Sequence, residues 1–161
     1  MRQAIGTTWT LQLVIIFMLI FVSFLALSIN YTKAFKIKNE LTTMIEKYEG
    51  LSEGNDGSIS IINNYLLYNN YTVMGKCEED EYGVDNLNDS IIKKVNKNEK
   101  YYYCVKKIDE ATEALPFKAK YKIKIFFNFS LPIIGQLFTF NVDGTTISIT
   151  NSMTDIETSY N

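Results

Sequence analysis

The stretch LQLVIIFMLIFVSFLAL at residues 11–27 constrains the fold of the whole chain. Its only polar members are Gln12 and Ser23, and no charged residue occurs between positions 3 and 32. A helix needs about 20 predominantly apolar residues to span a bilayer, and this block with its uncharged flanks provides them. The block therefore predicts a transmembrane helix, which we place at residues 7–32.

A cleaved secretory signal peptide is the main alternative for this block. Such a peptide has an apolar region of about 7–15 residues behind a basic start and before a small-residue cleavage site. Here the apolar run is longer, and Ala26-Leu27-Ser28 is followed by more helix-compatible sequence. A buried helix of a soluble protein is disfavoured because no polar face interrupts the block. A retained anchor is the favoured interpretation.

The helical pattern continues beyond the apolar block. Residues 33–50 carry apolar side chains at helical spacing on one face, as an amphipathic helix does. These residues are Ala34, Ile37, Leu41, Met44, Ile45 and Tyr48. No proline or glycine occurs from Thr7 to Glu49, and Gly50 is the predicted stop. One helix of about 40 residues would be roughly 60 Å long, and its amphipathic half must pack against the following domain.

Residues 51–161 predict a small domain that combines one helix with several strands. Residues 58–69 place apolar side chains on one side of a short helix, with Asp56 or Ser58 as its N-terminal cap. Runs of aromatic and β-branched residues predict the strands. These runs are residues 71–74, 101–108, 118–129, 136–142 and 145–150.

Residues 118–129 form the clearest strand pattern in the sequence. Apolar side chains alternate with lysines, so a slip of one residue would bury the lysines and the register is firmly set. The apolar members are Ala119, Tyr121, Ile123, Ile125, Phe127 and Phe129, and the basic members are Lys118, Lys120, Lys122 and Lys124. Residues 131–135 break this strand. Asp143-Gly144, between the last two strands, predicts a hairpin with a two-residue turn.

These patterns together predict an α+β fold. A long N-terminal helix, first transmembrane and then amphipathic, packs on a small, mainly antiparallel β-sheet. The apolar face of such a sheet needs a cover, and the amphipathic stretch at residues 33–50 is the predicted cover.

The composition disfavours several classes of function. Lys+Arg (16) and Asp+Glu (18) are nearly balanced, so no basic surface indicates a nucleic-acid partner. The sequence has no histidine, which removes the commonest catalytic base and the commonest zinc ligand. No nucleophile and base can be paired, so a membrane-tethered enzyme is the weakest hypothesis. We predict a protein that is not an enzyme and has no cofactor.

Cys77 and Cys104 are the only two cysteines, and they flank a polar stretch at residues 78–98 that predicts at most one short helix, at residues 90–95. An even count in an extracytoplasmic domain predicts one disulfide. Closing this loop would stabilise the domain by roughly 3–4 kcal/mol. The alternative is two reduced, buried cysteines that act as small apolar residues. A metal site is not predicted, because two cysteines without histidine leave the coordination incomplete.

Two charged clusters, the acidic run at residues 78–81 and the lysines of residues 118–124, can each have either a binding role or a purely structural one. The acidic run at residues 78–81, with Asp85, offers carboxylates to a cation but lacks the ligand spacing and glycine of a calcium loop. A solvated loop is therefore favoured. The lysines of residues 118–124 can bind anions or acidic lipid, but more often such a stripe is the wet face of a half-buried sheet.

Two opposing signals bear on the membrane orientation. Basic residues are more numerous on the C-terminal flank of the apolar block, which by the charge rule places that side in the cytoplasm. The paired cysteines instead indicate an oxidising compartment. We favour an extracytoplasmic domain.

The order of these features resembles type IV pilins, and more closely the TadE-like pseudopilins of tight-adherence pilus systems. The resemblance lies in the leader glycine and long helix of residues 6–48. It lies also in residues 121–150, with a strand followed by LPIIGQLF and FTFNVDGTTISIT. It implies that a prepilin peptidase cleaves between Gly6 and Thr7. These families carry a glutamate at the fifth mature position, where this chain has Leu11; an uncleaved chain would be a bitopic membrane protein of pilin-like build.

The predicted organisation is a leader at residues 1–6, a transmembrane helix at 7–32, an amphipathic continuation at 33–50 and an extracytoplasmic α+β domain at 51–161. The resemblance implies a structural subunit of a bacterial surface pilus or secretion apparatus. Its partners would be the lipid bilayer and other pilin-like subunits or assembly-platform membrane proteins. The alternative is a single-pass membrane protein whose outer domain binds a ligand or partner at the lysine stripe or at residues 78–98.

Overall fold

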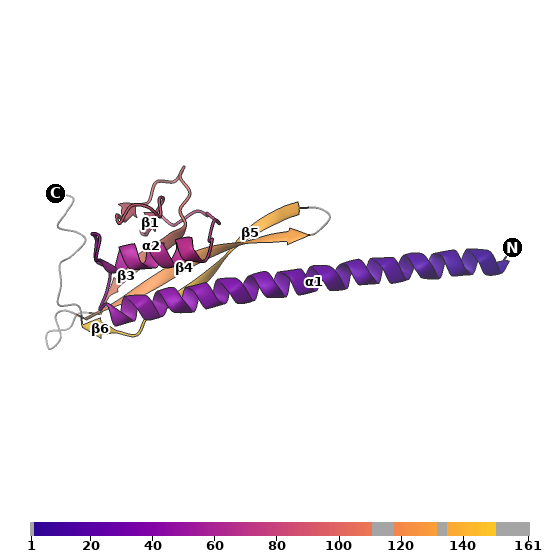
Figure 1. Ribbon diagram of the computed structural model, residues 1–161, viewed down its shortest axis with the longest axis horizontal. Helices are drawn as coiled ribbons and strands as arrows, with labels where there is room; N and C mark the ends of the chain where they lie inside the picture. The colour runs from indigo at the N-terminus through magenta and orange to yellow at the C-terminus, as the bar shows by residue number, and fades with distance from the viewer. Residues whose placement is uncertain (1, 111–117, 132–134, 151–161) are drawn as a thin grey trace.

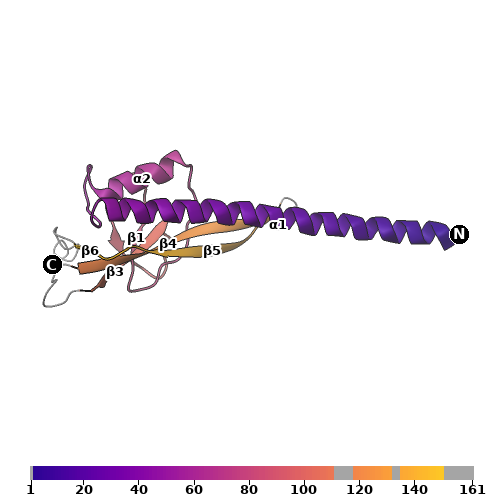
Figure 2. The same cartoon turned by 90° about the horizontal axis from the view of Figure 1, so that it is seen from below.

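The computed structural model of the chain describes residues 2–110, 118–131 and 135–150. The elements in this part of the chain are α1 (Arg2–Lys47), α2 (Ser58–Tyr68), β1 (Tyr82–Val84), β2 (Lys93–Lys94), β3 (Tyr103–Asp109), β4 (Lys118–Leu131), β5 (Gly135–Thr145) and β6 (Ile149–Thr150). The N-terminal half of α1 projects far beyond the rest, and the sheet and α2 gather around its C-terminal half (Figures 1 and 2). The predicted α+β architecture, with a long N-terminal helix on a small antiparallel sheet, is confirmed.

The long helix ends where the sequence predicts. After Lys47 the chain takes positive φ angles at Glu49 (55°) and Gly50 (126°). The Gly50 backbone N–H donates to the Ile45 carbonyl at 2.9 Å, which satisfies one of the last carbonyls of the helix. Glycine adopts this left-handed conformation without the steric cost of a Cβ.

β4 is the longest strand and lies inside the sheet, between β3 and β5. The strand order is β2-β1-β3-β4-β5, all neighbours are antiparallel, and the short β6 pairs with the start of β4. The strand at residues 118–129 is thus confirmed, and the strand predicted at residues 101–108 is observed as β3.

The hairpin predicted at Asp143-Gly144 is wrong. β5 runs straight through these residues beside β4, with Asp143 opposite Lys124 and Gly144 opposite Ile123. The hairpin connection lies earlier, because Leu131 pairs with Gly135. Residues 132–134, in the predicted strand break, lie outside the described residues.

Gly144 serves close packing of the sheet on α1. A Cβ added to Gly144 would lie 2.4 Å from Lys38 Cδ and 3.0 Å from Thr42 Oγ1, both on α1. Thr146 then interrupts the strand: its N–H donates to the Tyr121 carbonyl (3.0 Å), and its Oγ1 accepts from the Tyr121 N–H (3.0 Å). β6 resumes the pairing with β4, so the strand predicted at residues 145–150 is reduced to its last two residues.

Two smaller predictions, a strand at residues 71–74 and a side-chain cap on α2, are also wrong. Residues 71–74 form no strand, because the Tyr71 hydroxyl bonds to the backbone of Phe126 and only Gly75 makes a single bridge, to Tyr101. No helix forms at residues 90–95, where β2 pairs with β1 instead. α2 has Gly57 as its N-cap without a side-chain cap.

Neither predicted residue caps α2. Ser58 is the first helical residue, and its hydroxyl donates to the Gly50 carbonyl at 2.9 Å. Ser58 therefore ties the end of α1 to the start of α2 instead of capping its own helix.

The apolar face of β4 packs against α1, and α2 packs beside α1 in the same core. Ala34, Leu41 and Ile45 of α1 are buried in this core, whereas Tyr48 is exposed, contrary to the predicted apolar face. The buried members of β4 are Ala119, Tyr121, Ile123, Ile125 and Phe127. α2 adds three fully buried side chains, Ile59, Ile62 and Leu66. The amphipathic half of α1 is thus the predicted cover of the sheet.

Leu66→Ala and Leu67→Ala compare a buried and an exposed leucine on adjacent positions of α2. Leu66 is fully buried and Leu67 is 42% exposed. Leu66→Ala should lower the free energy of unfolding by about 2–5 kcal/mol because it leaves a cavity. Leu67→Ala should change it by well under that amount. Thermal unfolding of the full chain in detergent, followed by circular dichroism, measures both; equal losses would contradict the packing of α2.

Candidate functional site

The N-terminal half of α1 exposes apolar side chains in every direction. Every large apolar side chain from Trp9 to Leu25 is at least 44% exposed. The structure has one helix, Thr8–Lys47, that is long and apolar enough to cross a membrane. A helix that is apolar all round needs an apolar environment on all sides, which this chain alone does not provide. The exposed apolar surface of this helix is consistent with a membrane anchor.

Two hydroxyl groups near the C-terminal end of the apolar block and beyond it are bonded within the helix itself. Ser23 Oγ donates to the Leu19 carbonyl at 2.7 Å, and Thr32 Oγ1 donates to the Ser28 carbonyl at 2.8 Å. Such back-bonding removes the cost of placing a hydroxyl in an apolar environment. These polar side chains are therefore compatible with burial in lipid.

The predicted cleavage position lies within α1. The helix begins at Arg2 and passes through Gly6 and Thr7 without interruption. Cleavage between these two residues stays a prediction.

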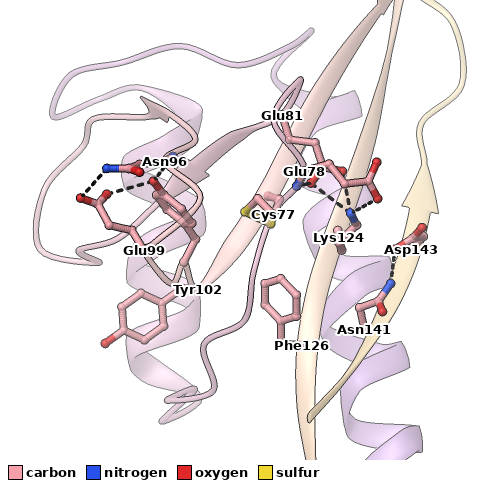
Figure 3. Close-up of a disulfide and its surroundings, with 12 residues drawn as sticks. Cys77, Glu78, Glu81, Asn96, Glu99, Tyr102, Lys124, Phe126, Asn141 and Asp143 are labelled. Atoms are coloured by element: carbon pink, nitrogen blue, oxygen red, sulfur yellow. Dashed lines mark hydrogen bonds and ion pairs between the residues drawn. A yellow bond between two sulfur atoms is a disulfide. The ribbon is translucent and has the colours of Figure 1, made fainter.

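The second face of β4 holds a buried ion-pair cluster around Lys124. The ammonium group lies 2.9 Å from Glu78 Oε1 and 2.9 Å from Glu81 Oε1, and the side chains of Lys124 and Glu81 are only 6% and 3% exposed (Figure 3). The Glu78 backbone N–H also donates to Glu81 Oε2 at 2.8 Å. Each charge in this cluster has partners, as a buried charge requires.

The acidic run and the lysine stripe, which the sequence presents as separate features, neutralise each other. Besides the Lys124 cluster, Asp80 pairs with Lys106 and Glu79 with Lys97. Two further lysines of β4 have partners on neighbouring segments: Lys120 lies 2.6 Å from Glu110, and Lys122 lies 3.0 Å from Asp143. The acidic run is expected to be a solvated loop, but Glu81 is buried. The lysines of β4 are expected to face water, but Lys124 is buried, because it and Glu81 cover each other.

Electrostatics favours the charged state of these groups. Burial alone would lower the pKa of Lys124, but hydrogen bonds to Glu78 and Glu81 outweigh it and raise that pKa above its ordinary value. The hydrogen bond from Lys124 lowers the pKa of Glu78, and the one from Lys106 lowers the pKa of Asp80. Lys124 and Glu78 therefore remain ionised across the neutral range.

A disulfide joins Cys77 to Cys104, with the two Cα atoms 5.7 Å apart. This separation lies in the ordinary range for a disulfide. Cys104 is opposite Lys124 in the β3–β4 register, so the two side chains share one face of the sheet. The bond thus fixes the start of the acidic run above that face, where Glu78 and Glu81 meet Lys124 (Figure 3).

The same place holds a group of three metal-ligating residue types. Ligand atoms of Cys77, Cys104 and Glu81 lie within 4.8 Å of one another. The two sulfurs are bonded to each other, and Glu81 is paired with Lys124, so neither thiolate nor free carboxylate is offered to a metal. The arrangement is structural.

A groove of about 320 Å³ lies where the domain meets the apolar half of α1. It is lined by α1, by the segment after α2 and by β4; its polar members are Asn30, Lys33, Asn69, Asn70, Thr72 and Asn128. The groove is open and shallow, and sequence patterns give no signal for it because its lining comes from three distant segments.

Comparisons with protein-family models, with curated proteins and with solved structures found no match to this chain.

Lys124→Met and Lys122→Met compare a buried and a half-exposed lysine on the same face of β4. Lys124→Met leaves Glu81 as an unpaired buried charge, so it should lower the free energy of unfolding by about 3–5 kcal/mol. Lys122→Met removes a partly exposed ion pair and should cost less than about 1 kcal/mol. Chemical denaturation of the full chain in detergent at pH 7 measures the difference.

The pH dependence separates this electrostatic effect from a packing effect. Carboxyl groups with lowered pKa values contribute stability above their unfolded pKa, which is 4.5 for Glu78, and lose it as the pH falls through the lower folded value. Wild-type stability should therefore fall below this pH. In Lys124→Met, acid neutralises the unpaired carboxylates, so the deficit relative to wild type should shrink. A deficit that is constant with pH would contradict the assignment.

Cys77→Ser with Cys104→Ser should destabilise the outer domain. The two cysteines are 27 residues apart, and closing such a loop stabilises by about 3.5 kcal/mol in the chain-entropy model. The double variant should also weaken the Lys124 cluster, because the acidic run loses its attachment to β3. Denaturation of oxidised, reduced and double-variant protein provides the measurement; unchanged stability on reduction would contradict a structural disulfide.

Proposed function

We propose that the protein is a membrane-anchored, pilin-like structural subunit of a bacterial surface pilus or secretion apparatus. The observation that carries the proposal is the division of α1 into two halves. One half exposes apolar side chains on all sides, and the other half is packed on an antiparallel sheet. The first half serves attachment and assembly, and the second half holds the domain.

The apolar half of α1 suits both a bilayer and a bundle of neighbouring helices. It carries no charged residue between Trp9 and Tyr31, and the hydroxyls of Ser23 and Thr32 are bonded within the helix. The same surface is therefore stable in lipid before assembly and against the helices of other copies afterwards. Assembly by this route needs packing alone and no catalytic group.

An extracytoplasmic location of the domain is part of the proposal. The Cys77–Cys104 disulfide supports it, since disulfides persist in oxidising compartments and are rare in the cytosol. The alternative of a partner-binding domain with a basic surface has less support, because the lysines at positions 120, 122 and 124 are paired with carboxylates.

Shearing of cells that produce the tagged full-length chain tests the proposal. The protein should be recovered in the sheared surface fraction as high-mass assemblies, with Thr7 as the N-terminal residue by mass spectrometry. Gly6→Leu should retain the chain in the membrane with an uncleaved N-terminus, since it alters the residue before the cleaved bond. Ala4→Leu is the matched control, and it should leave both properties unchanged.

Two outcomes would count against the proposal in different ways. Wild-type protein that is found only in the membrane pellet after alkaline extraction would remove the structural-subunit role and leave a single-pass protein. Wild-type protein that is released by alkaline extraction would remove membrane anchoring as well, because burial of an apolar helix far outweighs surface charge.

A further inference from the structure

We propose that the tip of the β4–β5 hairpin inserts into the headgroup layer of the bilayer that α1 crosses. The hairpin tip is defined here as residues 128–131 of β4 and 135–140 of β5. This inference rests on the proposed membrane anchoring but concerns a separate part of the chain. The protein would then contact phospholipid twice, through a transmembrane helix and through a shallow β-hairpin.

The direction of β4 brings the hairpin tip toward the membrane. The start of β4 lies near the end of α1, where Gly50 packs against the Tyr121 ring. Farther along β4, the Asn128 carbonyl accepts from Asn30 Nδ2 at 3.3 Å. β4 therefore runs antiparallel to α1, and the β4–β5 hairpin points along α1 toward its N-terminal half (Figure 1).

The dimensions of the two elements place the tip at the depth of the apolar block. β4 continues three residues beyond Asn128 to Leu131, which is about 10 Å at 3.3 Å per residue. The same rise corresponds to about seven residues of α-helix. Counting seven residues back from Asn30 along α1 gives Ser23, which lies within residues 11–27. If α1 spans the bilayer, the end of the hairpin lies about 6 Å inside the end of the apolar block, because Ser23 precedes Leu27 by four helical residues of 1.5 Å each.

The side chains of the tip suit this depth. Phe138 is 60% exposed and Phe140 is 45% exposed, although both are large aromatic residues. Phe140 stacks on Phe127 (centroids 5.5 Å apart), which in turn contacts Tyr31 of α1 edge-on (6.1 Å). Elements that lie in the membrane interface carry Phe, Trp or Leu on the face that enters the headgroup and acyl boundary. The sequence between Lys124 and Asp143 contains no charged residue that would oppose contact with lipid.

The backbone limits the insertion to the interface. β3 pairs with β4 only as far as Ile125, and no described strand covers the outer edge of β5. Unpaired backbone groups on these edges would be costly in hydrocarbon. In the hydrated headgroup layer, where amphipathic elements lie about 5–10 Å deep, water can satisfy them. A shallow insertion of the tip agrees with both the aromatic side chains and the open edges.

Tryptophan quenching by brominated phospholipids tests the inference in liposomes that contain the full-length protein. Trp9 is the only tryptophan, so wild-type protein reports on α1. Trp9→Phe combined with Phe138→Trp reports on the hairpin tip, and Trp9→Phe with Phe140→Trp is a second reporter should the first not fold. Trp9→Phe with Tyr68→Trp is the matched control, because Tyr68 is 87% exposed on α2.

The expected result is a loss of fluorescence at position 138 comparable to that of Trp9, with a blue-shifted emission and little quenching by aqueous iodide. Position 68 should show the reverse. Quenching of position 138 by iodide alone would overturn the inference, since the tip would then lie in water. Protection of position 138 from both quenchers would also overturn it, because a second copy of the chain would then cover the tip. Failure of the lipid to quench Trp9 would instead refute membrane anchoring itself.

Discussion

Burial of both faces of β4 is the constraint on which the rest of the structure depends. β4 lies between β3 and β5, and its alternating pattern gives it one apolar face and one face of lysines. The amphipathic half of α1 covers the apolar face, and α2 packs beside α1 in the same core. The lysine face is covered by a segment without regular structure, in which carboxylates rather than apolar side chains complement the sheet. Two different physical effects therefore stabilise the two faces of one strand.

The disulfide and the Lys124 cluster act together on the lysine face. The run at residues 78–81 is too acidic to fold over a sheet by apolar burial, and two of its carboxylates pair with Lys124, more than 40 positions away. The bond from Cys77 to Cys104 holds the start of this run at the lysine face. Desolvating Lys124 and Glu81 is costly unless their geometry is held in place, and the disulfide holds it. Reduction of the disulfide is therefore expected to weaken the Lys124 cluster as well.

Features governed by local periodicity could be predicted from the sequence. The continuity of α1 from residue 7 onward, its stop at Gly50, the position of α2 and the register of β4 all follow from patterns within each segment, whereas the start of α1 at Arg2 lies within the predicted leader. The absence of a turn at Asp143-Gly144 could not be predicted from local sequence. Gly144 is there because Lys38 and Thr42 of α1, about a hundred residues earlier, approach it closely. The pairing of the acidic run with the lysine stripe could not be predicted either, since opposite charges in a sequence do not say which carboxylate reaches which lysine. Disulfide pairing was predictable only because two cysteines allow a single connection.

The antiparallel packing of α1 on β4 also links the domain to the membrane. Contacts from Gly50–Tyr121 at one end to Asn30–Asn128 at the other fix the position of the sheet along the helix. Sliding the sheet by one helical turn would remove Leu41 and Ile45 from the core, so the height of the domain above the apolar block is not adjustable. Under the proposed function, withdrawing α1 from the bilayer would also withdraw the hairpin tip. Both surfaces would then need new apolar neighbours, and in a filament only other copies could provide them. Under this proposal, extraction of the subunit from the membrane is favourable only when another copy covers the apolar surfaces of both the helix and the hairpin.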